Sequence, residues 1–393
     1  MKRWFRLCCA LGCLLAAWSA AAQSMPEPPT VAARAYLLLD AGSGQELAAR
    51  QADEPVAPAS LAKLMTAYLV FDALRMQRLR LQDALPVSEL AQRQPGSRMF
   101  LRAGMKVPVE DLLKGLIVQS GNDAAVVLAE GVAGGVEPFV QRMNAQAQAW
   151  GLRQTRFANP TGLPAPAQQS TARELAVLAL RLLQDFPEHA PLFAIRKYRY
   201  PGTPAANDSN RNLLLFRDPT VDGLKTGHTE AAGYSLIATA RREFPGLGAE
   251  GRPGPWRLLA VVLGADSEQA RATEAQKLLN WGYTAFEPVK LFDAGQAVLT
   301  PAVWKGSQAT VRLGRPQQAM VVAVPAGSAR QLRLQARRPD PLVAPLGRGQ
   351  AVGALDVFLG ERTLASFPLM ALDEVSQAGL LGRAWDAFRL WIQ

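Results

Sequence analysis

Residues 58–66 have the sequence PASLAKLMT, in which Ser60 precedes Lys63 by three positions. Pro58 is typical of the first turn of a helix, so a helix is predicted to begin here with Ser60 in its first turn. Residues three apart on a helix share a face, which would bring the hydroxyl and the amine together. A serine hydroxyl needs a base to act as a nucleophile. Because a single Ser-x-x-Lys sequence is also common in ordinary helices with an exposed lysine, the interpretation depends on the rest of the chain.

A second short cluster, SGN at residues 120–122, supports a serine nucleophile. It follows an apolar pattern at residues 109–118 that predicts a helix. In this arrangement Ser120 would relay a proton to the leaving amine, and Asn122 would position the substrate amide and Lys63. Asn122 could instead simply cap the next helix, because asparagine is a preferred N-cap residue.

The third cluster, Lys225-Thr226-Gly227, ends a predicted strand. Lys225 and Thr226 would bind a substrate carboxylate through charge and a hydroxyl hydrogen bond. Gly227 would leave room for a peptide to approach the strand edge closely. The backbone N–H groups of Ser60 and His228 would then form an oxyanion hole, and His228 is expected to shape the site rather than act as the base.

Few other groups in the chain could act as a base or hold a metal. The sequence has two histidines, His189 and His228, and three cysteines that all lie within the first 13 residues. We therefore expect no metal site and no cofactor. Lys63 is the expected base by elimination, and its pKa must fall by several units from about 10.4. Burial and a nearby cation such as Lys225 both lower the pKa of a lysine.

Residues 1–22 have the pattern of a secretory signal segment. Positive side chains precede an apolar run at residues 7–17, and three alanines before Gln23 offer a cleavage site. The run is shorter than the roughly 18 residues that span a membrane, although an uncleaved anchor is the alternative. The net charge of the chain is +10, or +7 without this segment, which suits an anionic setting such as a membrane or cell wall. We expect no nucleic-acid binding, because no basic run or interleaved aromatic patch supports it.

Strand and helix patterns predict a catalytic domain at residues 23–285. Its fold class is α+β, with mixed helices on an antiparallel sheet in a two-layer body whose first and last strands pair. A segment rich in Gly and Pro at residues 245–255 is expected to form a surface loop between two strands. The strands are expected at residues 34–40, 45–50, 221–226, 234–240 and 258–263, and the helices at residues 109–118, 123–130, 137–150, 172–183 and 268–281.

After residue 285 the pattern changes to short alternating segments separated by Gly and Pro, which predicts a small all-β domain at residues 286–375. It contains no catalytic cluster, so we expect a spacer or docking role. Residues 376–393 predict an amphipathic helix with Trp385 and Phe388 on its apolar stripe. Because this helix is terminal and aromatic, we expect it to anchor the protein to a membrane surface, although it could dock on the protein's own core.

These clusters and their surroundings resemble the low-molecular-mass penicillin-binding proteins, the D-alanyl-D-alanine carboxypeptidases of peptidase family S11. The resemblance is strong over residues 33–283 and continues in the order of the later elements. It rests on PASLAKLMT at 58–66, QSGNDA at 119–124, FANPTGL at 157–163, STA at 170–172 and DGLKTGHT at 222–229. Two features depart from the family pattern: the segment after Leu163 lacks the His-Tyr that often precedes Ser-Thr-Ala, and the loop at residues 245–255 is longer than usual.

The resemblance implies a β-lactamase/transpeptidase-like catalytic domain, a small β-sandwich domain and a location at the periplasmic face of the cytoplasmic membrane. It implies removal of the terminal D-alanine from peptidoglycan stem pentapeptides, with Ser60 acylated and Lys63 as the base. β-Lactams would acylate the same serine. The alternatives are a D,D-endopeptidase, a β-lactamase and a penicillin-binding peptidoglycan scaffold without turnover. No Glu-x-x-Leu-Asn lies between Asn122 and Lys225, which disfavours a class A β-lactamase.

Overall fold

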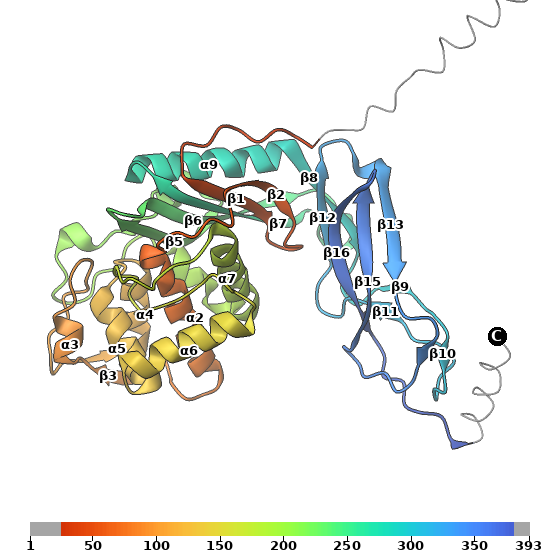
Figure 1. Ribbon diagram of the computed structural model, residues 1–393, viewed down its shortest axis with the longest axis horizontal. Helices are drawn as coiled ribbons and strands as arrows, with labels where there is room; N and C mark the ends of the chain where they lie inside the picture. Colours follow the sequence, from red (N-terminus) through yellow and green to blue (C-terminus); the bar gives the residue numbers. More distant parts are fainter. Residues whose placement is uncertain (1–24, 381–393) are drawn as a thin grey trace, which may run out of the picture.

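The computed structural model describes residues 25–380, which form two bodies that lie side by side (Figure 1). The larger body runs from β1 to α9 and the smaller from β8 to β16. The predicted signal segment at residues 1–22, and residues 381–393 of the predicted anchor helix, lie outside the described residues. Within the described part of the chain, no helix is both long and apolar enough to cross a bilayer.

A five-stranded antiparallel sheet forms the centre of the larger body. Its strand order is β2-β1-β7-β6-β5. Leu38 of β1 lies opposite Ala260 of β7, so the predicted pairing of the first and last strands is confirmed. The strands are β1 (Ala35–Asp40), β2 (Glu46–Arg50), β5 (Val221–Thr229), β6 (Gly233–Phe244) and β7 (Gly254–Ala265).

Helices cover both faces of this sheet, so the expected two-layer body is wrong. Leu37 and Leu39 of β1 join a core with α2, α4, α5, α6 and α7, whereas Leu38 joins a core with α9 on the other face. All of β1 is buried, as in a strand covered on both faces. The helices are α2 (Lys63–Arg75), α3 (Glu89–Gln92), α4 (Val109–Ile117), α5 (Asn122–Ala133), α6 (Val136–Ala149), α7 (Ala172–Asp185), α8 (Leu214–Arg217) and α9 (Glu268–Ala285), and the small hairpin is β3 (Ala84–Pro86) with β4 (Lys106–Pro108).

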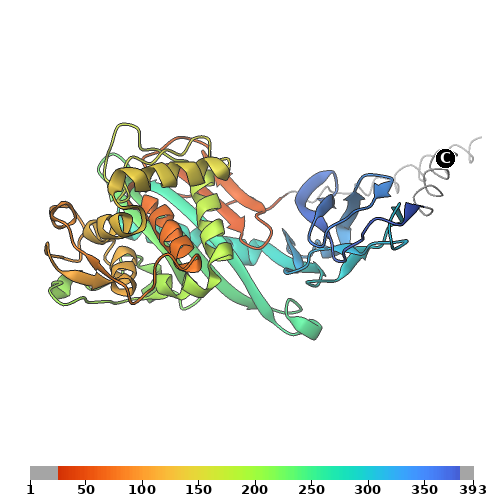
Figure 2. The ribbon, with the colours of Figure 1, turned by 90° about the horizontal axis from the view of Figure 1, so that it is seen from below.

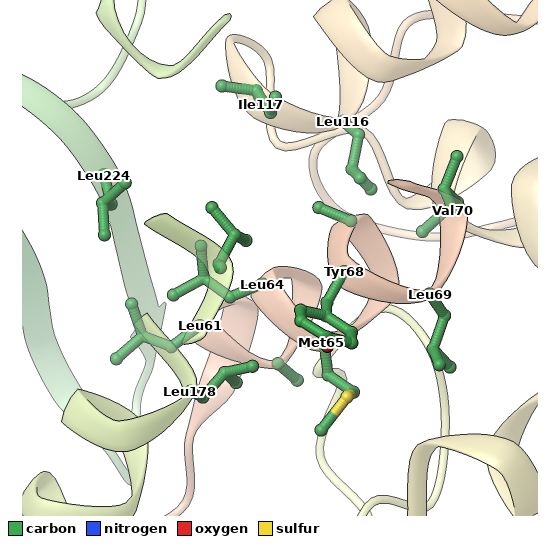
Figure 3. Close-up of a cluster of buried hydrophobic side chains, with 14 of the residues drawn as sticks. Leu61, Leu64, Met65, Tyr68, Leu69, Val70, Leu116, Ile117, Leu178 and Leu224 are labelled. Carbon is green, nitrogen blue, oxygen red and sulfur yellow. The ribbon is translucent and has the colours of Figure 1, made fainter. Parts of the chain in front are cut away.

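The helix predicted from Pro58 is divided in two. A 3-10 turn, η1 (Ala59–Ala62), carries Ser60, and α2 begins at Lys63. Apolar side chains of η1 and α2 pack against α4, α7 and β5, and Figure 3 shows among them Leu61, Leu64, Met65, Leu116, Ile117, Leu178 and Leu224. Each such side chain contributes about 1.5–3 kcal/mol on burial. This packing holds the turn with Ser60 against the sheet.

The smaller body is the predicted all-β domain. Its five-stranded sheet has the order β13-β15-β16-β11-β9, and the pairs β12-β8 and β10-β14 complete it. The predicted end at residue 375 and helix start at residue 376 are wrong, because Gln377 forms a bridge with Gly306 and the N–H of Ala378 donates to the carbonyl of Lys305 at 2.8 Å. The strands are β8 (Phe286–Phe292), β9 (Ala297–Leu299), β10 (Val303–Trp304), β11 (Leu313–Gly314), β12 (Met320–Pro325), β13 (Leu332–Arg337), β14 (Leu342–Val343), β15 (Ala351–Leu359) and β16 (Arg362–Ala371).

Several hydrogen bonds join the bodies, among them one from the N–H of Ala326 to the carbonyl of Ala285 at 3.0 Å. The buried amide of Gln45 donates to the carbonyl of Ala323 at 2.8 Å and accepts from its N–H at 3.0 Å. Lys290 of β8 donates to the carbonyl of Gly248 at 2.7 Å, at the tip of the β6–β7 hairpin. This hairpin projects as a long ribbon from the larger body (Figure 2). The loop at its tip spans residues 245–253, because β6 ends at Phe244 and β7 begins at Gly254. It is shorter than the predicted loop at residues 245–255.

Candidate active site

A cleft of about 460 Å³ opens where turn η1, the start of α5 and the end of β5 meet. All three sequence clusters reach it. Six of the eight predicted site residues line the cleft, and the other two, Lys63 and Lys225, lie beneath it and bond to Ser60 and Ser120. The lining side chains and backbone come from Ser60, Gly96, Ser97, Ser120, Asn122, Thr161, Gly162, Leu163, Arg211, Thr226, Gly227, His228, Thr229, Tyr234, Glu268 and Arg271.

Lys63 is 1% exposed and lies next to the predicted nucleophile. Its Nζ is 3.1 Å from Ser60 Oγ and donates to Asn122 Oδ1 at 2.7 Å and to the carbonyl of Thr161. Burial lowers the pKa of Lys63 to about 7, against an opposing effect of Asp123 and with a smaller contribution from Arg211. Half of the amine is therefore neutral near pH 7, as a general base requires.

Lys225 forms a second pair, with Ser120. Its Nζ is 2.9 Å from Ser120 Oγ and 3.1 Å from the carbonyl of Thr226. Burial, and then repulsion by Lys63 and Arg211, lowers the pKa of Lys225 well below its usual value. The sequence suggested Lys225 as the cation that acts on Lys63, but the cation that lowers the pKa of Lys63 is Arg211.

Asn122 takes up the positioning geometry and not the capping geometry. Its Oδ1 accepts from Lys63, and its Nδ2 donates to the carbonyl of Pro95 at 2.6 Å. The first turn of α5 has no side-chain cap. The neighbouring Ser120 has a φ of 60°, a left-handed conformation that is uncommon for serine and turns its hydroxyl toward Lys225. The capping alternative for Asn122 is therefore wrong.

The end of β5 supplies one wall of the cleft. A Cβ at Gly227 would lie 3.2 Å from the carbonyl oxygen of Pro58 and from Leu61, so this glycine lets the strand pack closely on the turn with Ser60. Thr226 is 5% exposed. His228 is exposed and stacks on Tyr234 with ring centroids 4.0 Å apart. The imidazole thus lies at the exposed rim of the cleft.

The sequence reasoning missed two arginines of the cleft. Arg271 of α9 is 2% exposed and donates to the carbonyls of Gly227 and Arg211, each at 3.3 Å. It also pairs with Glu268 at 3.0 Å. Arg211 lies in a loop before β5 and has no sequence pattern around it. A charged residue on the face of α9 that meets the sheet was the signal available for Arg271.

Comparison with known proteins identifies the family. Residues 22–267 match the family model of peptidase S11, described as D-alanyl-D-alanine carboxypeptidase. The chain belongs to the S11 peptidase family. Residues 286–377 match a second model, the C-terminal domain of penicillin-binding protein 5.

Similar S11 proteins align over almost the whole chain. D-alanyl-D-alanine carboxypeptidase DacC of Escherichia coli K12 is 40% identical over 95% of this chain and 92% of its own. DacA of Haemophilus influenzae is 36% identical over 95% of this chain and 93% of its own. Penicillin-binding protein 5 of H. influenzae, a solved structure, covers 90% of this chain and 100% of its own, with a TM-score of 0.77 and 34% identity.

A further structural neighbour has a ligand in its structure. Penicillin-binding protein D2 of Listeria monocytogenes, in its cefotaxime-bound form, covers 66% of this chain and 100% of its own. Its TM-score is 0.57 and its identity 28%. Over residues 25–380 of the present chain, no three His, Cys, Asp or Glu side chains gather as metal ligands.

Proposed function

We propose that this S11 peptidase is a serine-type D-alanyl-D-alanine carboxypeptidase that removes the terminal D-alanine from peptidoglycan stem pentapeptides. The observation that carries the proposal is the contact of 3.1 Å between Ser60 Oγ and the buried amine of Lys63, whose pKa is lowered to about 7. A neutral amine at this distance can accept the proton of the hydroxyl. The relatives named as carboxypeptidases align over more than nine tenths of the chain.

The proposed reaction has two steps. Ser60 Oγ attacks the carbonyl carbon of the penultimate D-alanine while its proton passes to Lys63 Nζ. The C–N bond to the terminal D-alanine then breaks, and the proton taken up by Lys63 passes through Ser120 to the leaving amine. Lys225 Nζ donates to Ser120 Oγ at 2.9 Å and so positions this hydroxyl. Water hydrolyses the acyl ester, which releases the shortened peptide and restores Ser60. No cofactor enters these steps.

The remaining residues of the cleft bind the substrate. Lys225 and Thr226 hold the terminal carboxylate, and Arg211 and Arg271 add positive potential along the same wall. Asn122 aligns Lys63 and the substrate amide. The N–H groups of Ser60 and His228 form the oxyanion hole, and the free edge of β5 pairs with the substrate backbone. The expected role of Gly227 in admitting the substrate is replaced by a packing role, because a side chain there would meet Pro58 and Leu61 at the turn with Ser60.

β-Lactams acylate Ser60 in this proposal, because their strained amide occupies the place of the D-alanyl-D-alanine bond. The cefotaxime-bound structure of penicillin-binding protein D2 of Listeria supports this, since its full length aligns with 66% of this chain. The discriminating experiment uses the chain from Gln23 and the peptide diacetyl-Lys-D-Ala-D-Ala. We expect release of free D-alanine, and none from Ser60→Ala. Stoichiometric labelling by penicillin without release of D-alanine would refute turnover and leave the scaffold function.

For the organisation of the chain we propose a signal segment at residues 1–22, a catalytic domain at residues 23–285, a β domain from residue 286 and an amphipathic anchor from Leu380 onward. The two family matches support the division, because the first ends at residue 267 and the second begins at residue 286. The protein would lie at the periplasmic face of the cytoplasmic membrane. Deletion of residues 379–393 should abolish binding to anionic lipid vesicles and leave activity on the soluble peptide unchanged. Unchanged partition into vesicles would refute the anchor.

A further inference from the structure

The loop from Asn159 to Leu163 contacts both the nucleophile turn and the base. The carbonyl of Thr161 accepts a hydrogen bond from Lys63 Nζ. Gly162 has a φ of +81°, and a Cβ there would lie 1.8 Å from the carbonyl oxygen of Ala59, directly before Ser60. The position of this loop therefore sets where one acceptor of the catalytic amine lies.

One side chain outside the cleft ties the two ends of this loop together. Gln168 is 7% exposed. Its Oε1 accepts from the N–H groups of Ala158 at 3.1 Å and Asn159 at 3.3 Å, and its Nε2 donates to the carbonyl of Leu163 at 2.7 Å. Asn159 completes the turn from within, because its Oδ1 accepts the N–H of Gly162 at 2.8 Å. The amide of Gln168 thus joins the entry of the loop to its exit, where the carbonyl of Leu163 also accepts from Asn159 Nδ2 at 3.0 Å.

The geometry of a neutral lysine explains why the loop matters. A neutral amine has two N–H bonds and one lone pair, and here the two acceptors are Asn122 Oδ1 and the carbonyl of Thr161. With both N–H bonds engaged, the lone pair faces Ser60 Oγ at 3.1 Å. Asn122 is held separately, by the carbonyl of Pro95. Loss of the Thr161 contact alone would let the amine rotate its lone pair away from the hydroxyl.

We propose that Gln168 is a positioning residue for acyl transfer to Ser60, because it fixes the loop whose Thr161 carbonyl orients the amine of Lys63. The inference rests on the proposed serine acyl transfer and adds to it a residue that contacts neither substrate nor nucleophile. Gln168 lies in the segment before Ser-Thr-Ala where the His-Tyr typical of the family is absent. An amide does not titrate, so this clamp has the same hydrogen bonds at every pH at which the protein is folded.

The test compares Gln168→Ala with Gln169→Ala. Gln169 is the matched control, because it is the adjacent residue, is exposed, and donates to the carbonyl of Gln154 on the other side of the segment. For Gln168→Ala we expect kcat and the rate of Ser60 acylation by penicillin to fall about tenfold to a hundredfold, as misplacement of a catalytic group by about 1 Å does. KM should change less than twofold, and Gln169→Ala should match the wild type.

The pH profile separates positioning from a general loss of structure. A carbonyl acceptor stabilises the ammonium form more than the neutral amine, so its displacement should move the acid limb of kcat/KM to lower pH. The charged groups that face Lys63 are Asp123, Arg211 and Lys225, and the variants leave all three in place. Gln168→Met preserves the volume of the side chain without its hydrogen bonds, and it should reproduce the effect if the alanine variant folds poorly.

Two outcomes would overturn the inference. One is a wild-type acylation rate in folded Gln168→Ala and Gln168→Met. The other is a lower rate with an unmoved acid limb and a KM that rises in parallel. A wild-type protein that releases no D-alanine would instead contradict the carboxypeptidase function, and the acylation rate with penicillin would still test the role of Gln168.

Discussion

The larger body, which contains the cleft, and the β domain differ in the polar side chains that they bury. The catalytic body buries Lys63, Lys225 and Arg271, each at most 3% exposed, and the two lysines bond to hydroxyl, amide and carbonyl oxygens. In the described part of the β domain, the buried polar side chains are Ser328 and Asp356. Burial of an amine without a carboxylate partner is unfavourable. The larger body therefore contains buried amines that lower its folding stability, whereas the described part of the β domain buries no lysine or arginine.

The largest effect should come from removal of the buried amine itself. Lys63→Met keeps the length of the side chain and removes the base, and we expect kcat/KM to fall about 10²- to 10⁴-fold, the usual contribution of a general base. Release of D-alanine from the soluble peptide measures it. Lys106→Met, at an exposed position of β4, is the control and should keep full activity. Activity within tenfold of the wild type would mean that another group acts as the base.

The lowered pKa of Lys63 predicts the pH dependence. The base acts in its neutral form, and its pKa is about 7. Below this pH the amine is protonated, so kcat/KM should fall about tenfold per pH unit, or about a hundredfold by pH 5, and reach a plateau above pH 7. Steady-state rates between pH 5 and 8 measure the effect. A flat profile over this range would show that the pair of Ser60 and Lys63 does not limit the rate.

Arg271 offers an intermediate effect, because its charge is buried at the wall of the cleft. Arg271→Gln removes a cation from the carboxylate-binding side and weakens the contact with the carbonyl of Gly227. A hydrogen bond to a charged group contributes about 1.5–3 kcal/mol, so we expect KM to rise about tenfold or more with a smaller change in kcat. Arg93→Gln on exposed α3 is the control. An unchanged KM would show that Lys225 and Arg211 suffice.

The smallest effect on activity should come from the core of the β domain. Leu369 is fully buried on β16, and Leu369→Ala should lower the free energy of unfolding of this domain by about 2–5 kcal/mol. Hydrolysis of the soluble peptide should stay within twofold of the wild type. Thermal unfolding and the release assay on the same sample measure both quantities. A parallel loss of activity would contradict the division of roles between the domains.

Local spacing explains what could be predicted from the sequence. Ser60 and Lys63 are three residues apart, so turn geometry alone places the amine at the hydroxyl. The apolar run at residues 35–40 predicts a buried strand for the same local reason. Arg211, Arg271 and the carbonyl of Thr161 reach the cleft only through tertiary packing. Of the three, Arg271 alone has a local signal, which is its place on the buried face of α9. The continuous apolar run of β1 is typical of a strand covered on both faces, so this signal for the second helical layer was present in the sequence. No local pattern in α9, however, shows that it covers the face opposite to the other helices.

The direct passage from α9 to β8 has a mechanical consequence. Helix α9 ends at Ala285 and β8 begins at Phe286, with no residue between them, and Gln45 bonds across the junction to Ala323. Because no linker separates the two bodies and hydrogen bonds cross between them, the junction should limit their relative motion. If the C-terminal end of the β domain is attached to the membrane as proposed, the β domain holds the cleft at a constant distance from the membrane surface. The enzyme would then cleave stem peptides within a narrow range of distances from the membrane. A flexible insert after Ala285 would broaden this range.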